Sequence, residues 1–597
     1  MFNKYPINPV RHHLPYTLKI GFEPIIEHLS HVCNHSSGDP LILCVDGTNG
    51  ADFRSMVTHI REHLGQNGFS VEVQSTSDYL KSHSQLQEHF RKNITDNRAF
   101  GYVTDGEISD YFIPGARSLF ESKCKEFTGS YGDSKKVFIL YGPGAYWLTE
   151  GKGDQFLFLD VSREYQQIQY KNQLPNFGMN WNSDFVVQYK IAYFVEWPIL
   201  EKYRKNLLDK IDIYVDMNRP EEPVSIEGKG LKEIILHIAR YPLRVKPFYF
   251  PGVWGGQRLK ELAGLPDDFV NCAWQYEPIA PENSILIGLG DRVIEVPFLI
   301  VMGLAHRTIM GERAVRLFGD YFPIRFDYLD TIDGENLSIQ VHPKQEYIKK
   351  HFNEKLEQQE SYYIMEKKGN SKVYLGLTEK CTKEEFLDKI QTAQETGIPF
   401  NYKEYVNEFD TEKGDLYLIP TGTVHCAGKN NLVLEISATT WWFTFKIYDY
   451  LRKDLDGKPR PVNIDHGFAN IDFHKKTGWV KENLMPTPVL INKQGENEEY
   501  LLGQRDDLLF FVKRIHLKNE WKDNTFGEFV MYNLVEGERV RIVSCRDESV
   551  FVELSYAESY ILPAVFGEYK IVNLGSEPCK LVKAGISPNW EAKIIEG

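Results

Sequence analysis

Leu337-Ser338-Ile339-Gln340-Val341-His342-Pro343 alternates apolar residues with Ser, Gln and His. This period of two is typical of a β-strand that is buried on one face. Residues two apart on a strand project to the same side, so Gln340 and His342 should face one side together. A neutral imidazole beside an amide oxygen suits half of a metal site. The alternative is a barrel strand with two polar residues that are simply hydrogen-bonded.

Two later stretches favour the metal site. Glu360 enters a β-rich run, Gln358-Gln359-Glu360-Ser361-Tyr362-Tyr363. His425 follows Gly414-Asp415-Leu416-Tyr417-Leu418-Ile419-Pro420-Thr421-Gly422-Thr423-Val424, which predicts a strand, a Pro-Thr-Gly turn and a histidine. The chain therefore offers further candidate metal ligands at two additional places.

The motifs at 337–343 and 414–425 resemble those of the class I, cupin-type mannose-6-phosphate isomerases. The resemblance covers about residues 250–470 and begins at Trp254-Gly255-Gly256. It implies one divalent metal, usually zinc, held by four ligands: Gln340, His342, Glu360 and His425. It also implies an aldose–ketose isomerase that converts mannose 6-phosphate to fructose 6-phosphate, or a related sugar, through an enediol.

The resemblance further implies two catalytic residues, Glu435 and Lys446, although the family carries an arginine where Lys446 stands. An Arg-to-Lys change replaces a bidentate fork by a point charge. Both residues also have a purely structural explanation: Glu435 could be a hydrogen-bonded residue of a strand, and Lys446 could form an ion pair with a nearby carboxylate. We expect the substrate to be bound by Ser338, Gln358 and Arg325.

Several departures bear on the substrate. Lysines that the family carries stand here as Gln358 and Asp327, and its Gln-Gln-Ser-Ser-Asp run is replaced by Ser437-Ala438-Thr439-Thr440-Trp441. Lysines hold phosphate well, so their loss weakens the case for a phosphorylated sugar. A catalytically weak sugar- or nucleotide-sensing protein that keeps the metal site is the alternative function, and a pocket lined by Trp441 and Trp442 would favour it.

Composition sets wider limits. A chain of 597 residues is too long for one hydrophobic core. The net charge of −14 argues against nucleic acid or an anionic membrane as the main partner. The resemblance implies a sugar or sugar phosphate as the partner, and the oligomeric state stays open. No apolar run is long enough to span a membrane or to serve as a leader. Eight scattered cysteines without a C-x-x-C pair favour the cytoplasm.

The N-terminal part shows α/β alternation. A buried strand at 41–45, a loop at 46–53 and a helix at 54–64 have the layout of a phosphate-binding loop. The pattern loosely resembles the uridine-kinase branch of P-loop kinases over about residues 38–220. A working loop needs Gly-Lys-Ser/Thr where this chain has Asp52, Phe53 and Arg54, so we expect a degenerate, structural or nucleoside-sensing domain. Phe53 likewise argues against a bifunctional kinase–isomerase.

The predicted fold is therefore multidomain. It has a degenerate P-loop-kinase-like α/β domain (1–240), then a mainly-β cupin, or jelly-roll, domain with a helical insertion at 383–394 (245–480). A second cupin-like barrel without a metal follows (485–597). The stretch 558–564 echoes 414–420, and Glu568 stands five residues after Pro563 as His425 stands after Pro420.

Overall fold

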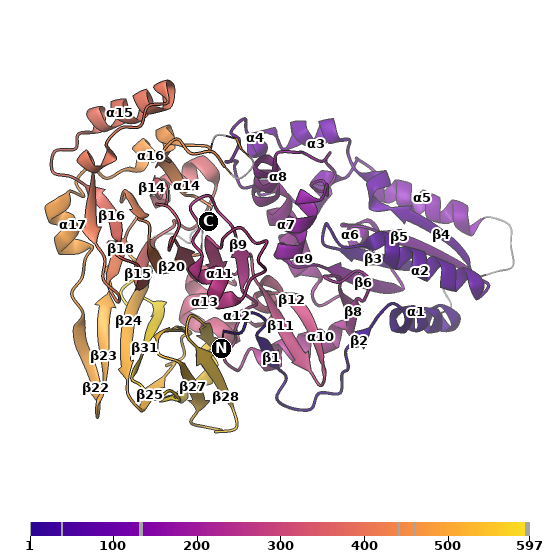
Figure 1. Cartoon of the computed structure of the whole chain (residues 1–597). Coiled ribbons are helices and arrows are strands. Elements are labelled where there is room, and N and C mark those ends of the chain that lie inside the picture. Colours follow the sequence, from indigo (N-terminus) through magenta and orange to yellow (C-terminus); the bar gives the residue numbers. More distant parts are fainter. Residues whose placement is uncertain are drawn as a thin grey trace. The chain divides into compact units, whose positions relative to one another are not determined.

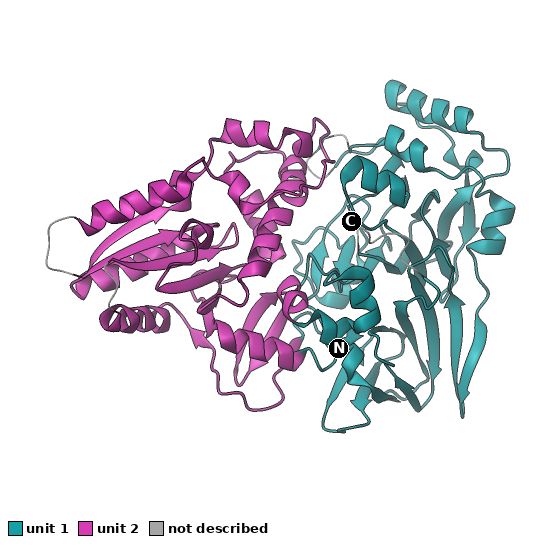
Figure 2. Ribbon diagram, turned by 180° about the vertical axis from the view of Figure 1, so that it is seen from behind, with its two compact units in different colours: residues 1–6, 239–283, 305–597 teal, residues 7–238, 284–304 magenta. Residues whose placement is uncertain are grey.

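The computed structural model describes residues 2–36, 40–129, 135–439, 442–454, 457–458 and 460–590. The chain divides into two compact units (Figure 2): unit 1 comprises residues 1–6, 239–283 and 305–597, and unit 2 comprises residues 7–238 and 284–304. The finer division into three domains stays a prediction. Among the described residues, none of the helices has the length and apolarity needed to cross a lipid bilayer.

Unit 2 is an α/β unit built on a seven-stranded sheet with the order β2-β8-β7-β6-β3-β5-β4 (Figure 1). Strands β4, β5, β3, β6 and β7 are parallel, and β8 is antiparallel to β7. The strands are β2 (Lys19–Ile20), β3 (Leu41–Gly47), β4 (Ser70–Ser75), β5 (Lys136–Tyr141), β6 (Gln155–Asp160), β7 (Ile213–Asp216) and β8 (Val224–Glu227). The strand predicted from the apolar run at 41–45 is confirmed as β3.

Helices cover this sheet because their apolar residues recur at helical spacing. Met56, Val57, Ile60 and Leu64 of α2 join the apolar core that also contains residues of α1 and β3. The longer helices are α1 (Glu23–His35), α2 (Phe53–Gln66), α3 (His83–His89), α5 (Ala116–Thr128), α7 (Arg163–Lys171), α8 (Phe185–Ile191), α9 (Trp197–Leu207) and α10 (Gly228–Ile238). A π-helical turn (Ala192–Glu196) joins α8 to α9. A separate three-stranded sheet contains β1 (Ile7–Pro9), β11 (Ser284–Leu289) and β12 (Arg292–Pro297), which α12 (Phe298–Met310) follows.

Unit 1 contains two sheets that bear the predicted metal ligands. One has the order β18-β15-β20-β13-β10-β9 and the other β17-β16-β19-β14-β21. The first is made of β9 (Phe248–Phe250), β10 (Trp274–Tyr276), β13 (Ile324–Asp330), β15 (Glu360–Lys367), β18 (Leu416–Ile419) and β20 (Asn431–Ala438). The second is made of β14 (Ile339–Val341), β16 (Lys372–Leu377), β17 (Val406–Asp410), β19 (His425–Ala427) and β21 (Phe445–Tyr448). Every residue of β13 and β20 is buried, because the strands are covered on both faces.

Helices follow or interrupt these strands. They are α11 (Arg258–Ala263), α13 (Glu312–Phe318), α14 (Gln345–Phe352), α15 (Lys383–Thr396), α16 (Ile464–Asn470) and α17 (Thr477–Asn483). The helix predicted at 383–394 is confirmed as α15, which Thr382 caps at its N-terminus. The strand predicted at 337–343 is confirmed only for its centre, Ile339–Val341, and it ends before Pro343, which cannot donate a ladder hydrogen bond.

The last part of unit 1 is a second pair of antiparallel sheets, with the orders β22-β23-β24-β31-β26-β29 and β25-β30-β27-β28. The strands are β22 (Val489–Gln494), β23 (Asn497–Gly503), β24 (Phe510–Leu517), β25 (Glu520–Asn524), β26 (Val530–Glu536), β27 (Arg539–Ser544), β28 (Phe551–Ser555), β29 (Ser559–Leu562), β30 (Glu568–Asn573) and β31 (Cys579–Ile586). One apolar core, which includes Ile515, Leu534 and Leu581, lies between them. All of these strands lie within residues 485–597, for which a second β barrel is predicted.

Candidate metal centre

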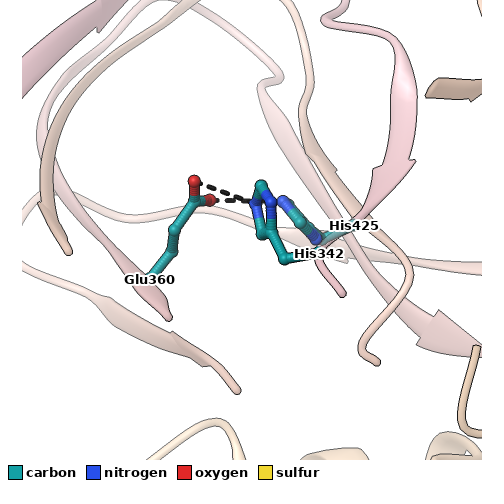
Figure 3. Close-up of side chains that lie close together, drawn as sticks. All are labelled: His342, Glu360 and His425. Carbon is teal, nitrogen blue, oxygen red and sulfur yellow. Dashed lines mark ion pairs between the residues drawn. The ribbon is translucent and has the colours of Figure 1, made fainter. Parts of the chain in front are cut away.

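Three of the four predicted ligands converge in unit 1. One possible ligand atom from each of His342, Glu360 and His425 lies within 4.8 Å of the others (Figure 3). The Nε2 atom of His342 is 2.9 Å from Glu360 Oε1, and Nε2 of His425 is 3.3 Å from Glu360 Oε2. All three side chains are at most 2% exposed. The residues therefore form a compact group that could hold a metal ion.

The tautomers of the two histidines support a cation between them and Glu360. Nδ1 of His342 lies 3.2 Å from the carbonyl oxygen of Phe443, and Nδ1 of His425 lies 2.9 Å from that of Thr423. A carbonyl can only accept, so each Nδ1 carries the proton and each Nε2 presents a lone pair to the carboxylate. His342 Nε2 and Glu360 Oε2 have no hydrogen-bond donor. Acceptors facing acceptors in a buried site fit a bound cation.

The five-stranded sheet aligns Gln340 with these histidines. Gln340 is the register partner of His425 on one side and of Lys446 on the other, so their side chains share one face of the sheet. The amide nitrogen of Gln340 lies 3.3 Å from His425 Nε2, and its oxygen accepts a hydrogen bond from Ser338. Gln340 thus lies beside the His–Glu–His group, as strand alternation predicts.

The six-stranded sheet supplies charged residues. The Arg325 guanidinium lies 2.5 Å from Glu435, 3.3 Å from Glu360 and 3.5 Å from Asp327, and it donates to Ser437. Three buried carboxylates therefore share a single guanidinium, and a divalent cation beside them would favour their ionised forms.

The pKa shifts of the charged groups have a common origin. Burial raises the pKa of Asp327 to about 7. Burial, followed by repulsion from Asp327 and Glu360, raises the pKa of Glu435 well above its ordinary value. Burial also lowers the pKa of His342, which favours the neutral imidazole that binds metals. The donor set of two neutral imidazoles and a carboxylate suits zinc.

Lys446 is the cation of the site that lacks a partner. Within the described part of the chain, no carboxylate lies within ion-pair distance of its ammonium group. Burial, with a smaller contribution from Arg460, lowers its pKa to about 8. An unpaired lysine on the same sheet face as Gln340 is available to a ligand in this site.

The other predicted residues contact the ligands directly. Ser338 donates to Gln340, and Gln358 donates to Glu360 at 2.5 Å. Arg325 is engaged by carboxylates, as described above. The structure therefore brings together all nine residues proposed for metal, substrate and catalysis. Trp441, whose presence beside the pocket would favour the sensor function, lies outside the described residues.

Sequence reasoning missed two residues of the site. Tyr362 is the register partner of Glu435, its ring centroid is 5.9 Å from that of His425, and its buried hydroxyl has no hydrogen-bond partner. The sequence could have indicated Tyr362 only by its position two residues after Glu360, which places both side chains on the same face of one strand. Lys475 donates to Thr421 O at 2.7 Å and to Thr423 Oγ1 at 2.9 Å, and so fixes the turn before His425. No local pattern around Lys475 indicates this contact.

Comparison with known proteins gives the following relatives. The "Mannose-6-phosphate isomerase ManA" of Bacillus subtilis (strain 168) is 30% identical over 332 residues, which are 55% of this chain and 95% of that protein. The "Probable mannose-6-phosphate isomerase GmuF" of the same organism is 26% identical over 333 residues, 55% of this chain and 96% of that protein. A family model described as "Domain of unknown function (DUF8485)" matches residues 21–240.

Solved structures give low-scoring matches over a similar share of the chain. The mannose 6-phosphate isomerase from Bacillus subtilis has 22% identity and a TM-score of 0.48, covering 58% of this chain and 100% of that chain. A mannose 6-phosphate isomerase bound with zinc and yttrium has 15% identity and a TM-score of 0.43, covering 58% of this chain and 99% of that chain.

Proposed function

The chain belongs to the mannose-6-phosphate isomerase family, and from this premise we propose that it is a metal-dependent aldose–ketose isomerase. Its proposed reaction interconverts mannose 6-phosphate and fructose 6-phosphate, or a closely related pair of sugars. The observation that carries the proposal is the buried His342–Glu360–His425 group, in which lone pairs face a carboxylate. That arrangement needs a cation and lies in the part of the chain that carries the family motifs.

The proposed cofactor is one zinc ion held by His342, Glu360 and His425, with Gln340 as the fourth ligand. When bound, zinc supplies Lewis-acid polarisation of a carbonyl oxygen. Two histidines, one glutamine and one carboxylate match the ligand types that zinc accepts. The carbonyl oxygens of Phe443 and Thr423 accept from the Nδ1–H groups of the two histidines and so hold them in the required tautomer.

The protein's own groups have to move a proton between C1 and C2 of the sugar. We assign the proton transfer to Glu435, a buried carboxylate that Arg325 holds beside Glu360. We assign Lys446 to the stabilisation of negative charge on the sugar oxygens, since its ammonium is unpaired. Ser338 and Gln358 are proposed substrate contacts. Arg325 would act on the sugar indirectly, by holding Glu435 and Glu360.

The test is an isomerase assay of the full chain after removal of metal and reconstitution with Zn²⁺. Mannose 6-phosphate, glucose 6-phosphate and free mannose are offered in parallel, and ketose formation is measured. We expect turnover of mannose 6-phosphate that depends on the metal. Absence of turnover with every sugar would contradict the proposal, and binding without turnover would favour the sensor function.

For unit 2 we propose a P-loop-kinase-like fold that does not hold a nucleotide phosphate. The strand–loop–helix order of β3, residues 48–52 and α2 supports the first part. The residues at the key loop positions, Asp52, Phe53 and Arg54, support the second. Titration of the full chain with ATP and Mg²⁺ should give no binding heat.

The eight cysteines are free thiols, which fits the cytoplasmic location that we also propose.

A further inference from the structure

A cavity of about 980 Å³ lies in the C-terminal pair of sheets, within unit 1. Its lining includes residues of β23, β24 and β31 from the six-stranded sheet and residues of β25 and β30 from the four-stranded sheet. The cavity therefore opens between the two sheets. None of the residues assigned to the metal centre lines it.

The inner face of the six-stranded sheet changes character at this cavity. Ile515 of β24 and Leu581 of β31 belong to the apolar core. Two residues away on the same strands and the same face stand Lys513 and Lys583, directly opposite each other in the register. Like charges in opposed positions destabilise a sheet. Packing of the apolar core therefore does not explain why these two lysines face inward.

Only one of these lysines is neutralised by the protein. Lys583 forms an ion pair with Asp523 of β25, across the cavity. Lys513 lies over the ring of Phe511, with its Nζ 5.1 Å from the centroid. Among the described residues, no carboxylate lies within ion-pair distance of Lys513. The cavity wall thus carries a half-buried ammonium group with donors to spare.

Glu499 of β23 provides the complementary group. It lines the cavity, it is 6% exposed, and its Oε1 atom is buried without a hydrogen-bond donor. A buried acceptor that has lost water without gaining a donor costs free energy. The cavity therefore has an acceptor that needs a donor and a donor that needs an acceptor, on adjacent strands of one sheet.

The third feature is aromatic surface. Phe511 lines the cavity wall, and Phe526, in the loop after β25, also lines it although its side chain is 82% exposed. Phe526 has a φ of 52°, a backbone conformation that bulky residues rarely adopt. Glu568, which takes the place of His425 in the sequence echo between the two barrels, lines the same cavity.

We propose that this cavity is a binding site for a neutral hexose, separate from the metal centre. Hydroxyl groups both donate and accept, so one sugar can satisfy Glu499 and Lys513 together. An anion would be repelled by Glu499, and a cation by Lys513. Phe511 and Phe526 offer flat apolar faces to the C–H face of a sugar ring, the mixed apolar and polar lining that small-molecule sites share. The proposal does not depend on the isomerase activity proposed above.

The experiment is a calorimetric titration of the full chain with methyl α-D-mannopyranoside and methyl α-D-glucopyranoside. Their blocked anomeric carbon prevents isomerisation, so the heat reports binding alone. We expect a dissociation constant of about 1 mM for at least one of them. Glu499→Leu and Lys513→Met should each weaken binding about tenfold or more, since each removes a charged hydrogen-bond partner. Phe526→Ala, at an exposed position, should weaken it less and keep the fold.

The matched control is Glu498→Leu, because Glu498 neighbours Glu499 on β23 but pairs with Lys493 and Tyr500. It should bind as the wild type does, and so should His342→Ala. Three results would overturn the proposal: no binding of either glycoside, equal binding by the Glu499, Lys513 and Phe526 variants, or loss of binding only in His342→Ala. Binding of inorganic phosphate in place of the glycosides would also overturn it.

Discussion

Buried carboxylates gather both in the metal centre of unit 1 and around the loop before α2 of unit 2, but only those of the metal centre keep buried oxygens without a hydrogen-bond donor among the described residues. In the metal centre, Glu360 faces two histidine lone pairs. At the end of β3, just before the loop, Asp46 accepts hydrogen bonds from the backbone N–H groups of Gly47, Gly144 and Tyr146 and from the hydroxyl of Tyr203. The first arrangement needs an external cation, and the second needs no ligand.

Glu196 repeats the pattern of the loop. It is fully buried on the π-helical turn, and it accepts hydrogen bonds from Asn49 of the loop, Tyr170, Asn176 and the backbone N–H of Phe177. Buried anions that are hydrogen-bonded to neutral donors can be held without a counter-ion. A phosphate would meet carboxylates here. The number of hydrogen-bond donors around each buried carboxylate therefore distinguishes the two kinds of site. Carboxylate oxygens without donors indicate a site for a cation, and carboxylates with several donors indicate a site that excludes an anionic ligand.

The largest effect is expected in the metal centre of unit 1, the region of the comparison that fits a cation. His342→Ala and His425→Ala should each remove the metal and abolish turnover, because each deletes one of three converging ligand atoms. Loss of a residue that only orients a metal ligand lowers metal affinity or activity by about 10–100-fold, and loss of a ligand itself should lower them further. The barrel should stay folded, since its core is apolar. Metal content, ketose formation and circular dichroism are measured on each variant.

The matched control for these variants is His474→Ala, which changes an exposed histidine of unit 1. It should keep both metal and activity. Full metal occupancy in both ligand variants would disprove the assignment of the site.

The sequence predicted this site well in one respect and poorly in another. The alternation at 337–343 and the turn before His425 are local patterns, and they predicted candidate ligands, His342 and His425, that the structure brings together. The contacts of Arg325 with Glu435 and Glu360 depend on how β13, β20 and β15 pair. These strands are far apart in the sequence, so no local period encodes their register.

The same distinction explains the N-terminal result. The apolar run at 41–45 and the helical spacing after residue 53 predicted β3 and α2, because both are local. The residues at 52–54 also predicted that the loop departs from a phosphate-binding one. Glu196 could not be predicted as a neighbour of that loop, since 147 residues separate it from Asn49.

A smaller effect is expected from Lys446, the unpaired cation of the metal centre. Lys446→Met should lower kcat by about 10²–10³-fold and leave the metal content unchanged, because removal of one electrostatic stabiliser in a buried site has this size. Lys446→Arg should retain or raise activity, since it restores the fork that the family carries at this position.

Exposed Lys481→Met serves as the control for the loss of a lysine. The values of kcat and KM and the bound metal are measured for the wild type and the three variants. If Lys446→Met keeps the kcat and KM of the wild type, Lys446 has no part in the mechanism, and Glu435 remains the candidate.

The smallest effect is expected at Asp52, in the loop before α2, which is the region of the comparison that should exclude a ligand. Asp52 is the N-cap of α2: its carboxylate accepts from the Ser55 backbone N–H at 3.0 Å and from the Ser55 hydroxyl at 2.6 Å. The carboxylate thus occupies the helix N-terminus, where other proteins bind phosphate. Asp52→Ala should destabilise α2 by about 1 kcal/mol, because an N–H group loses its acceptor. Hydrogen exchange in peptides from residues 41–66 measures this change.

Asp52→Asn separates the cap from the charge. Asparagine caps helices about as well as aspartate, so this variant should lose only the charge–dipole contribution of about 0.3–1 kcal/mol. It should still bind no ATP in the presence of Mg²⁺, because Asp46, Asp160 and Glu196 remain in and around the loop. Calorimetry with ATP is run on both variants and the wild type. If Asp52→Asn gains ATP binding, then the carboxylate of Asp52 alone keeps phosphate out of the loop. The carboxylates of Asp46, Asp160 and Glu196 would then not be sufficient to exclude it.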